Sequence, residues 1–256
     1  MSLLNLRDFG GYPTTGGKAM KRGVLFRSGD LDRATTRELR SLESLGLKTV
    51  IDLRPSKEQK KRTRQIPGAR TMTIPFDVDQ TARERVGPLL LKKDSQGGIE
   101  EAIRGLYTTM VDDQQGPLGN VFRMLLPAEN SPLLIHCRAG KDRTGFVCAV
   151  VQWALGFEAP FILQDYLLSN DHFLPEARRI SRLTKWMTLG LLPTENFTFA
   201  LTVRSSYIQV VIDRIGKTYG GIGPYLERCG IGSPEVEILK ERFLDKRSAW
   251  RMEERR

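Results

Sequence analysis

PLLIHCRAGKDRTGFVCAVVQWALG, residues 132–156, holds two apolar runs separated by a polar loop that contains two glycines. The first run, residues 132–136, is short and apolar, which is typical of a buried strand. The second run, residues 146–156, is long enough for three turns of an apolar helix. The segment therefore predicts a strand, a tight loop and a helix in succession, which is the basic unit of an α/β protein.

The alternation of strands and helices continues on either side of this segment. A helix is predicted from Thr35, because Thr35 and Glu38 have the spacing of a capping box and Gly46 stands where a helix stops. Further strands are predicted at 23–26, 48–54 and 69–76, and further helices at 99–110, 121–126, 161 to about 190, 203–219 and 233–248. This order favours an α/β fold with a largely parallel sheet and a helical C-terminal half.

The length of the chain, 256 residues, allows one core that needs no disulfide or metal for stability. No internal repeat and no long linker divides it, so we expect a single domain over residues 1–256. Residues 77–130 and 171–200 contain helices with apolar stripes and basic faces, and are possible lid or insert segments that either cover a pocket or pack on the sheet. The charge run at residues 57–64 is expected to form a solvated helix face.

The composition limits the classes of partner and ligand. Lys and Arg number 40 against 30 acidic residues, and the formal net charge of +10 attracts anions at long range. Nucleic-acid binding is disfavoured, because the charged runs at 57–64 and 240–256 lack the interleaved aromatic residues that stack on bases. Three Cys without a C-x-x-C pair and two His leave too few ligands for a structural zinc site, so we expect neither a metal nor a cofactor.

The N-terminal segment reaches Arg7 and Asp8 before a long apolar run can form, which is unlike a signal peptide. No uncharged apolar window reaches the roughly 18 residues that a membrane-spanning helix needs, so no transmembrane segment is expected. We therefore expect reduced thiols and a cytoplasmic location, while export by a route without an N-terminal signal remains open.

The loop HCRAGKDRTG, residues 136–145, carries the candidate chemistry. Cys137 follows the predicted strand and Arg143 begins the predicted helix, which places the thiol beneath a ring of backbone amides. Those amides and the helix dipole bind a dianion, and their field favours the thiolate over the thiol. A thiolate beneath a bound phosphate is the arrangement for phosphoryl transfer through a phosphocysteine. The alternative, a core thiol and a helix-capping arginine, does not account for the complete decapeptide in its context.

Other residues of the loop suit supporting parts in this chemistry. The planar guanidinium of Arg143 can hold two phosphate oxygens at once, and the Thr144 hydroxyl is placed to stabilise the departing Cys137 thiolate. Gly140 and Gly145 permit the tight turn and close packing. We expect His136, which precedes the nucleophile, to position the loop through hydrogen bonds rather than to act as a base.

The decapeptide resembles the active-site signature of the protein tyrosine phosphatase superfamily, in particular the microbial branch with GKDRT in the loop. Members of that branch act on phosphotyrosine and in some cases on phosphoserine, phosphothreonine or phosphoinositides. Similar sequences occur through most of the chain, at NLRDFGGY (5–12), LFRSGDL (25–31), LGLKTVIDLRPSKEQ (45–59), DYLLSN (165–170) and YGGIGPYLERCGI (219–231). Residues 77–130 and 171–200 match least.

The resemblance implies a phosphatase domain with a twisted, mainly parallel sheet, in which Cys137 is the nucleophile and Arg143 binds phosphate without a metal. It also implies a substrate cradle made by the backbone amides of the loop: Arg138, Ala139, Gly140, Lys141, Asp142 and Arg143. Arg7, Asp8, Arg27, Asp52 and Arg54 recur in the resembling family, and we expect them to brace the loop.

Expulsion of the leaving group needs a general acid. The resembling branch carries an acid within the phosphate loop, so Asp142 is the first candidate; the alternative is that it is a fixed counter-ion of Lys141 or Arg143. Asp77 and Asp79, in a loop after a predicted strand, could instead supply a mobile acid, although solvated turn carboxylates are the more common case.

The expected substrate is a phosphorylated protein, cleaved by a tyrosine phosphatase of broad, dual specificity, with phosphate or vanadate as pocket ligands. Lys141 and Arg138 add positive charge at the rim, which favours phosphoinositide or inositol phosphate hydrolysis as the alternative. A phosphate-binding protein without activity would lack the nucleophile, the arginine or the acid, and all three are present.

Overall fold

The computed structural model describes residues 5–59, 64–189 and 191–245, with the backbone alone for residue 33 and residues 79–83. Five strands form one sheet in the order β1-β2-β5-β3-β4. Their bounds are β1 Arg7–Asp8, β2 Leu25–Ser28, β3 Thr49–Asp52, β4 Arg70–Thr73 and β5 Leu133–His136. Every pair is parallel except β1 with β2, so the predicted, mainly parallel α/β sheet is confirmed.

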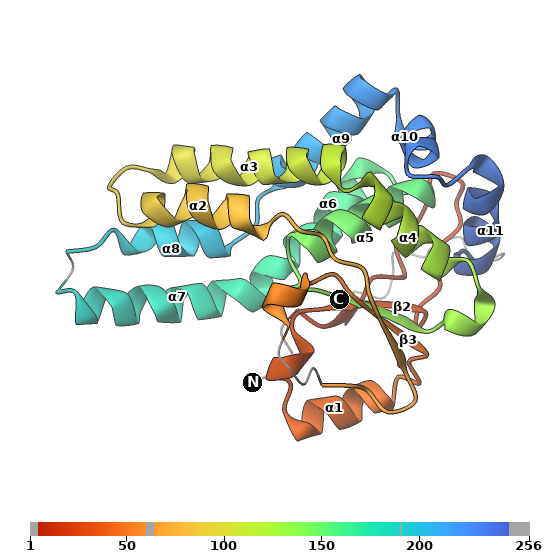
Figure 1. The fold of residues 1–256 in the computed structure, drawn as a ribbon, viewed down its shortest axis with the longest axis horizontal. Coiled ribbons are helices and arrows are strands. Elements are labelled where there is room, and N and C mark those ends of the chain that lie inside the picture. Colours follow the sequence, from red (N-terminus) through yellow and green to blue (C-terminus); the bar gives the residue numbers. More distant parts are fainter. Residues whose placement is uncertain (1–4, 60–63, 190, 246–256) are drawn as a thin grey trace.

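The three inner strands β2, β3 and β5 are buried on both faces, because helices cover both sides of the sheet. On one side lies α1 (Thr36–Glu43), whose Leu42 packs on Val50 and Leu134 of the sheet. The predicted capping box is present, since the Thr35 hydroxyl accepts from the Glu38 amide and Glu38 accepts from the Thr35 amide. Figure 1 shows α1 on one side of the sheet and most other helices on the opposite side.

The opposite side holds the larger core, built around the apolar helix α5 (Arg143–Ala154), which directly follows the phosphate-loop candidate. The helices around it are α3 (Gln96–Asp113), α4 (Gln115–Leu125), α6 (Ala159–Leu167), α9 (Ser205–Tyr219), α10 (Ile222–Arg228) and α11 (Ser233–Phe243). Three short 3-10 helices, η1 (Leu31–Arg33), η2 (Ser56–Glu58) and η3 (Ala128–Asn130), lie in connections. The apolar stripe predicted at 99–110 faces this core.

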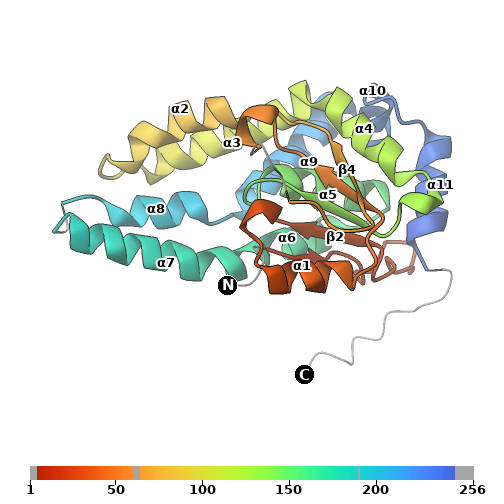
Figure 2. The ribbon, with the colours of Figure 1, turned by 60° about the horizontal axis from the view of Figure 1, so that its bottom comes forward.

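Two helical hairpins extend beyond one end of the sheet (Figures 1 and 2). One consists of α2 (Asp79–Leu90) and α3, and the other of α7 (Ser169–Met187) and α8 (Thr194–Leu201). Asp79 was expected to lie in a loop, but α2 begins at this residue, and Val86, Leu89 and Leu90 of the helix pack on the core. The α2–α3 hairpin falls within the predicted lid or insert segment 77–130, and the α7–α8 hairpin extends slightly past both ends of the predicted segment 171–200.

Within the described ranges, every helix is either too short or too polar to cross a lipid bilayer.

Candidate active site

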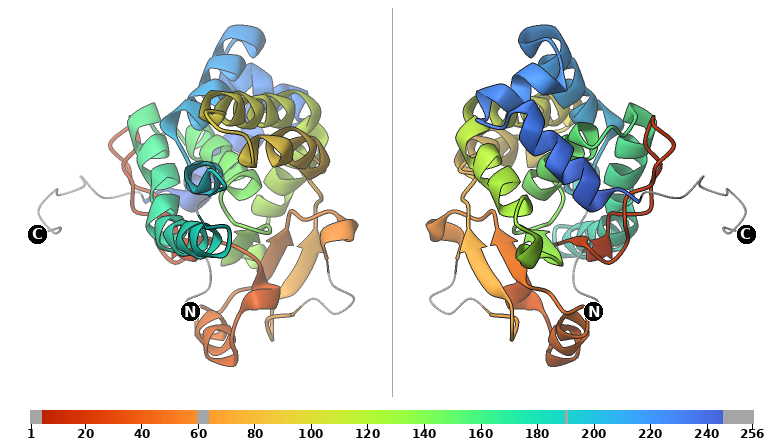
Figure 3. Two further views of the ribbon diagram at one scale, coloured as in Figure 1. Left: turned by 90° about the vertical axis from the view of Figure 1, so that its left-hand side faces the viewer. Right: turned by 90° about the vertical axis from the view of Figure 1, so that its right-hand side faces the viewer.

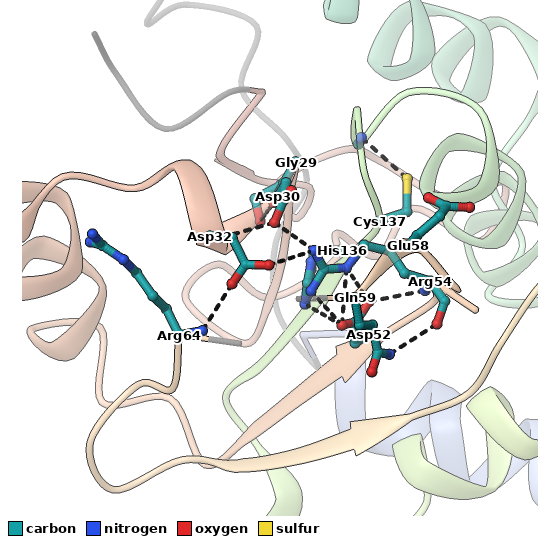
Figure 4. A network of polar contacts seen from close by, with 12 residues as sticks. Gly29, Asp30, Asp32, Asp52, Arg54, Glu58, Gln59, Arg64, His136 and Cys137 are labelled. Atoms are coloured by element: carbon teal, nitrogen blue, oxygen red, sulfur yellow. Dashed lines mark hydrogen bonds and ion pairs between the residues drawn. The ribbon is translucent and has the colours of Figure 1, made fainter. Parts of the chain in front are cut away.

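Cys137 lies at the carboxyl end of β5, the central strand of the sheet, and its side chain is almost fully buried. The chain then turns back so that the Gly140 amide donates a hydrogen bond to Cys137 Sγ, with a nitrogen–sulfur distance of 3.2 Å. Figure 4 shows this sulfur and the loop that curves above it. A backbone N–H is thus directed at the sulfur of the candidate nucleophile.

Gly140 holds the loop in its tight turn, as predicted. Its φ is +70°, and a Cβ at this position would lie only 2.4 Å from the Ser28 carbonyl oxygen. The Gly140 carbonyl accepts from Asn5 Nδ2 at 2.6 Å and from Arg27 Nη2 at 3.1 Å. Any larger residue would therefore move the loop away from β2 and break these two contacts.

A group of charged side chains packs against the loop and supports it. Asp165 of α6 accepts from Arg27 Nη1 at 2.7 Å and from Arg7 Nε at 3.0 Å, and Arg27 and Asp165 are both buried. Asn5 links the group to α7 through Ser169 Oγ at 3.2 Å. Segments 5–12, 25–31 and 165–170, distant in sequence, thus meet at this one place, and the predicted bracing by Arg7 and Arg27 is observed.

A second buried network lies beside Cys137 (Figure 4). The Arg54 guanidinium contacts the carboxylates of Asp52 at 2.8 Å, Asp30 at 2.7 Å and Asp32 at 3.0 Å. Burial by itself would lower the pKa of Arg54, but the hydrogen bond and charge of Asp52 outweigh it and raise that pKa above its ordinary value. Asp52 and Arg54, which were predicted to brace the loop, therefore stabilise the carboxyl end of β3, next to the strand that carries the nucleophile.

His136 does not act as predicted. Neither ring nitrogen has a hydrogen-bond partner among the described residues, and Nε2 lies 3.8 Å from Asp52 Oδ2. Burial is the largest cause of a lowered His136 pKa, and Arg54 lowers it further while Asp52 opposes the shift. His136 is therefore a neutral, buried ring and does not position the loop through hydrogen bonds.

Arg143, at the start of α5, forms a two-point ion pair with Glu58. Nη1 lies 3.0 Å from Oε1 and Nη2 lies 2.8 Å from Oε2, with both side chains at most 5% exposed. The prediction of a solvated helix face at 57–64 is wrong for Glu58, which belongs to the short η2 and points toward the Arg143 guanidinium. Residues 60–63 of that run lie outside the described residues. Because Glu58 binds both terminal nitrogens of Arg143, it fixes the orientation of the guanidinium plane toward a ligand.

The remaining cradle residues differ in exposure. Arg138 is exposed and Ala139 is partly buried, while Thr144 is buried and its hydroxyl has no hydrogen-bond partner among the described residues. Gly145 allows close packing, since a Cβ there would lie 2.8 Å from the Tyr166 ring. An unpartnered hydroxyl at the start of α5 is free to bind a group that forms during the reaction.

Lys141 does not point outward to the rim as expected. Its Nζ donates to the Ala200 carbonyl of α8 at 2.9 Å and lies 5.8 Å from the centre of the Phe173 ring of α7. The side chain is nearly buried, and Asp142 Oδ2 lies 3.7 Å from the ammonium. Lys141 therefore joins the phosphate loop to both helices of the α7–α8 hairpin.

Asp142 is partly exposed, and Tyr107 Oη donates to its Oδ1 at 3.2 Å. The Tyr107 and Tyr166 hydroxyls are 2.6 Å apart. Burial raises the pKa of both tyrosines well above the ordinary value, so both stay protonated donors. Because Tyr107 gives its hydrogen to Asp142, Tyr166 donates to Tyr107, and the chain of donors ends on the carboxylate.

Asp77 sits in an exposed turn and pairs with Lys57 at 2.7 Å, which matches a solvated turn carboxylate. The side chain of Asp79 lies outside the described part of the structure. Cys148 and Cys229 are buried free thiols, and burial raises the pKa of each to about 12, which makes them inert. Among the described residues, no three His, Cys, Asp or Glu side chains form a group that could hold a metal ion.

A buried thiol that accepts from a loop amide, with an arginine at the start of the next helix, suits attack on a bound phosphate, the chemistry of cysteine-dependent phosphatases. Comparison with known proteins agrees with this class. The model of the tyrosine phosphatase family matches residues 1–245, so the chain belongs to that family. The predicted resemblance and the predicted enzyme class, a phosphoric monoester hydrolase of the protein-tyrosine-phosphatase type, are confirmed.

Individual relatives span nearly the whole chain. The triple specificity protein phosphatase PtpB of Mycobacterium tuberculosis is 34% identical, over 92% of this chain and 95% of its own length. A tyrosine-protein phosphatase of Nostoc commune is 24% identical, over 90% of this chain and 78% of its own. Among solved structures, the core catalytic domain of the yeast (S. cerevisiae) PP-IP phosphatase SIW14 covers 73% of this chain and 96% of its own, with 14% identity and a TM-score of 0.38.

Sequence reasoning did not identify Glu58 or Tyr107 as site residues. Glu58 stood in a run of charges that resembled a helix surface, and Tyr107 stood between apolar residues of a helical stripe. A weak signal existed for Glu58, since it follows closely after a strand whose carboxyl end borders the loop. For Tyr107 the only signal was a hydroxyl on an otherwise apolar face.

Proposed function

We propose that the chain hydrolyses phosphotyrosine, and with broader specificity phosphoserine and phosphothreonine, through a phosphocysteine on Cys137. The observation that supports this most is the placement of one thiol, one directed backbone amide and one arginine within a single loop: Cys137 Sγ accepts from Gly140, and Arg143 begins the next helix. Such a loop binds the three outer oxygens of a phosphate monoester and leaves the phosphorus open to the sulfur.

In the first step the Cys137 thiolate attacks phosphorus, the sulfur–phosphorus bond forms and the ester oxygen leaves. Asp142 supplies the proton that this oxygen needs, since a phenoxide or alkoxide is a poor leaving group. In the second step water attacks phosphorus, the sulfur–phosphorus bond breaks and inorganic phosphate is released. Asp142 takes the proton of the water, and the Thr144 hydroxyl donates to the departing thiolate.

The backbone amides from Arg138 to Arg143 form the cradle in this proposal, with Ala139, Gly140 and Lys141 contributing through the main chain. Phosphate and vanadate are the simplest ligands that fit it, because both present tetrahedral or trigonal oxygens to N–H donors. Arg143 follows the oxygens as phosphorus flattens, and Glu58 keeps its guanidinium plane aligned.

An alternative with the same mechanism is hydrolysis of a phosphoinositide or inositol phosphate. The exposed Arg138, next to the nucleophile, supports it, because additional phosphates on a substrate need cations beyond the cradle. Lys141 supports it less in the observed arrangement, since its ammonium is already bound to α8.

The lid segments are part of the proposal. We place the α7–α8 hairpin over the phosphate loop within one domain, held to the loop by Lys141. Asn170 and Val203 exchange two hydrogen bonds that join the two ends of the hairpin to each other. A cover of this kind selects substrates by size and opens on a slower time scale than side-chain motion.

A reducing compartment such as the cytoplasm suits this enzyme, because the reaction needs a free thiol and all three cysteines are free and buried. Cell fractionation with an antibody to the chain would locate it. Recovery only outside the cell would contradict this part of the proposal.

The decisive experiment is a substrate panel assayed with the wild type and with Cys137→Ser. We expect turnover of an aryl phosphate to fall by at least roughly a thousandfold in the variant. The same panel compares a phosphotyrosine peptide, a phosphoserine peptide and phosphatidylinositol phosphates, and the largest kcat/KM identifies the substrate class. Wild-type turnover in Cys137→Ser would refute the proposed reaction.

A further inference from the structure

Exposed apolar side chains gather at one end of the molecule. The large apolar residues with the highest exposure in the described ranges are Leu91, Leu183, Trp186, Met187, Leu189, Leu191 and Ile238. All except Ile238 lie at or near the tips of the two helical hairpins, and Trp186 and Leu189 are 78% and 90% exposed. We refer to Leu183, Trp186, Met187, Leu189 and Leu191 as the apolar tip. A concentration of this kind marks an interaction surface.

The apolar tip adjoins a row of cations on α7. At 3.6 residues per turn, spacings of four and three place Arg178, Arg182 and Lys185 on one stripe of the helix, and all three are exposed. Leu183 and Trp186 follow these cations by one residue each, so they form a second exposed stripe beside the first. The buried positions Phe173 and Ala177 lie on another side of the helix, which faces the protein.

The charge near the end of this hairpin, between residues 177 and 193, has one sign. Residues 177–193 contain four cations, at Arg178, Arg179, Arg182 and Lys185, and no acidic residue. A basic stripe beside an apolar stripe with a tryptophan is the composition of a helix that lies in a membrane interface. The partner that complements both stripes at once presents anionic groups above an apolar layer.

The second hairpin extends the same surface. Asn196 of α8 is buried and donates to Ser95 Oγ at 3.0 Å and to the Lys92 carbonyl at 2.8 Å, which ties the α2–α3 turn to α8. That turn carries exposed Leu91, Lys92 and Lys93. The left view of Figure 3 looks toward the ends of both hairpins, which lie together on this side.

We propose that the apolar tip binds the surface of an anionic lipid bilayer. Trp186 and Leu189 enter the boundary between headgroups and acyl chains, while Arg178, Arg182 and Lys185 contact lipid phosphates. A bilayer fits better than a folded partner, because the hairpins that carry these residues project from one end of the molecule (Figure 1) and the residues themselves are highly exposed. The proposal concerns a surface away from Cys137 and does not rest on the proposed reaction.

The test is sedimentation with vesicles of phosphatidylcholine alone and with about one third phosphatidylserine. We expect the wild type to sediment with the anionic vesicles and to be released as salt rises. Each cation changed among Arg178→Gln, Arg182→Gln and Lys185→Gln should weaken binding by roughly fivefold. Trp186→Ser combined with Leu189→Ser should weaken it by at least roughly tenfold.

Ile238→Ser is the matched control, because Ile238 is also an exposed apolar residue but lies on α11, away from both hairpins. It should sediment like the wild type. All variants should keep wild-type turnover of a small aryl phosphate, so a loss of vesicle binding cannot be attributed to unfolding. The same assay with Cys137→Ser, which abolishes the proposed reaction, should leave vesicle binding unchanged.

Tryptophan fluorescence gives a second measurement. On anionic vesicles we expect a blue shift of the emission that Trp186→Phe removes while binding remains. Equal sedimentation with neutral and anionic vesicles, or binding that survives the Trp186→Ser and Leu189→Ser changes, would overturn the proposal. Concentration-dependent dimerisation that those same changes abolish, without vesicle binding, would assign the tip to a second copy of the chain instead.

Discussion

Glu58 and Arg143 face each other edge to edge, with nitrogen–oxygen distances of 3.0 and 2.8 Å, and so the guanidinium proposed to bind phosphate already has a buried counter-ion. The pair joins a short connection after β3 to the first residue of α5. Its bidentate form leaves one edge of the guanidinium occupied by protein, which limits how a substrate can approach the other.

Removal of the Glu58 charge should destabilise the free enzyme. Because both partners are buried, Glu58→Ala is expected to lower the free energy of unfolding by roughly 3 kcal/mol. Inorganic phosphate should restore more stability to the variant than to the wild type, since the dianion then takes the place of the missing carboxylate. Thermal unfolding with and without phosphate measures both effects. An equal phosphate-dependent rise in Tm for the two proteins would contradict this account.

Asp142→Asn should remove the general acid. We expect kcat for an aryl phosphate to fall by about 10² to 10⁴-fold and the basic limb of its pH profile to disappear. Asp77→Asn is the control, because Asp77 is an exposed carboxylate paired with Lys57, and its profile should match the wild type. Should the basic limb survive in Asp142→Asn, another group must donate the proton.

Tyr107→Phe tests the donor chain that ends on Asp142. The Tyr107 hydroxyl holds the Asp142 carboxylate in place, so its loss leaves that carboxylate free to turn away from the leaving group. We therefore expect kcat for an aryl phosphate to fall by roughly tenfold, with KM little changed. Tyr219→Phe, which removes a similar 2.9 Å bond to Asp112 away from the loop, should leave kcat unchanged. An equal fall of kcat in both variants would argue against a specific role for Tyr107.

Lys141→Met should loosen the α7–α8 hairpin, because the ammonium contact with the Ala200 carbonyl is lost. Trypsin should then cleave after Arg178 or Arg179 faster than in the wild type. Lys217→Met, which removes an exposed ammonium paired with Asp213 on α9, is the control. Vanadate in the pocket should change the rate at which trypsin cleaves the α7–α8 hairpin. If trypsin cleaves the α7–α8 and α2–α3 hairpins at the same rates with and without vanadate, neither hairpin is a moving lid.

His136 should make stability depend on pH. Burial is the main cause of its lowered pKa, so between that value and the ordinary value near 6.5 the unfolded chain binds a proton that the native state does not. The contribution of the neutral His136 to the free energy of unfolding is therefore complete above about pH 6.5, and the free energy of unfolding decreases as pH falls below that value.

Chemical denaturation between about pH 5 and pH 8 measures this slope. His136→Gln should flatten it. His172, which is only partly buried and whose pKa is also lowered mainly by burial, should give a smaller change when replaced by Gln. An unchanged slope in His136→Gln would show that this histidine does not control stability in acid.

The sequence alone determined the site loop and most of the elements around it. Periodic apolar residues, caps and glycines are local signals, and so the strand at 132–136, the turn at Gly140 and the capping box of Thr35 followed directly from neighbouring residues. The family could also be identified at this stage, because the decapeptide at 136–145 is contiguous.

Only the tertiary structure decided which residues surround that loop. Glu58 and Arg143 are 85 positions apart, Lys141 and Ala200 are 59 apart, and Tyr107 and Asp142 are 35 apart. Such pairs depend on how helices and connections pack across the sheet, and no local pattern records that. A charged residue within a charged run is predicted to be solvated unless a distant partner is known. The buried contacts of Glu58 with Arg143 and of Lys141 with the Ala200 carbonyl could therefore be found only in the folded chain.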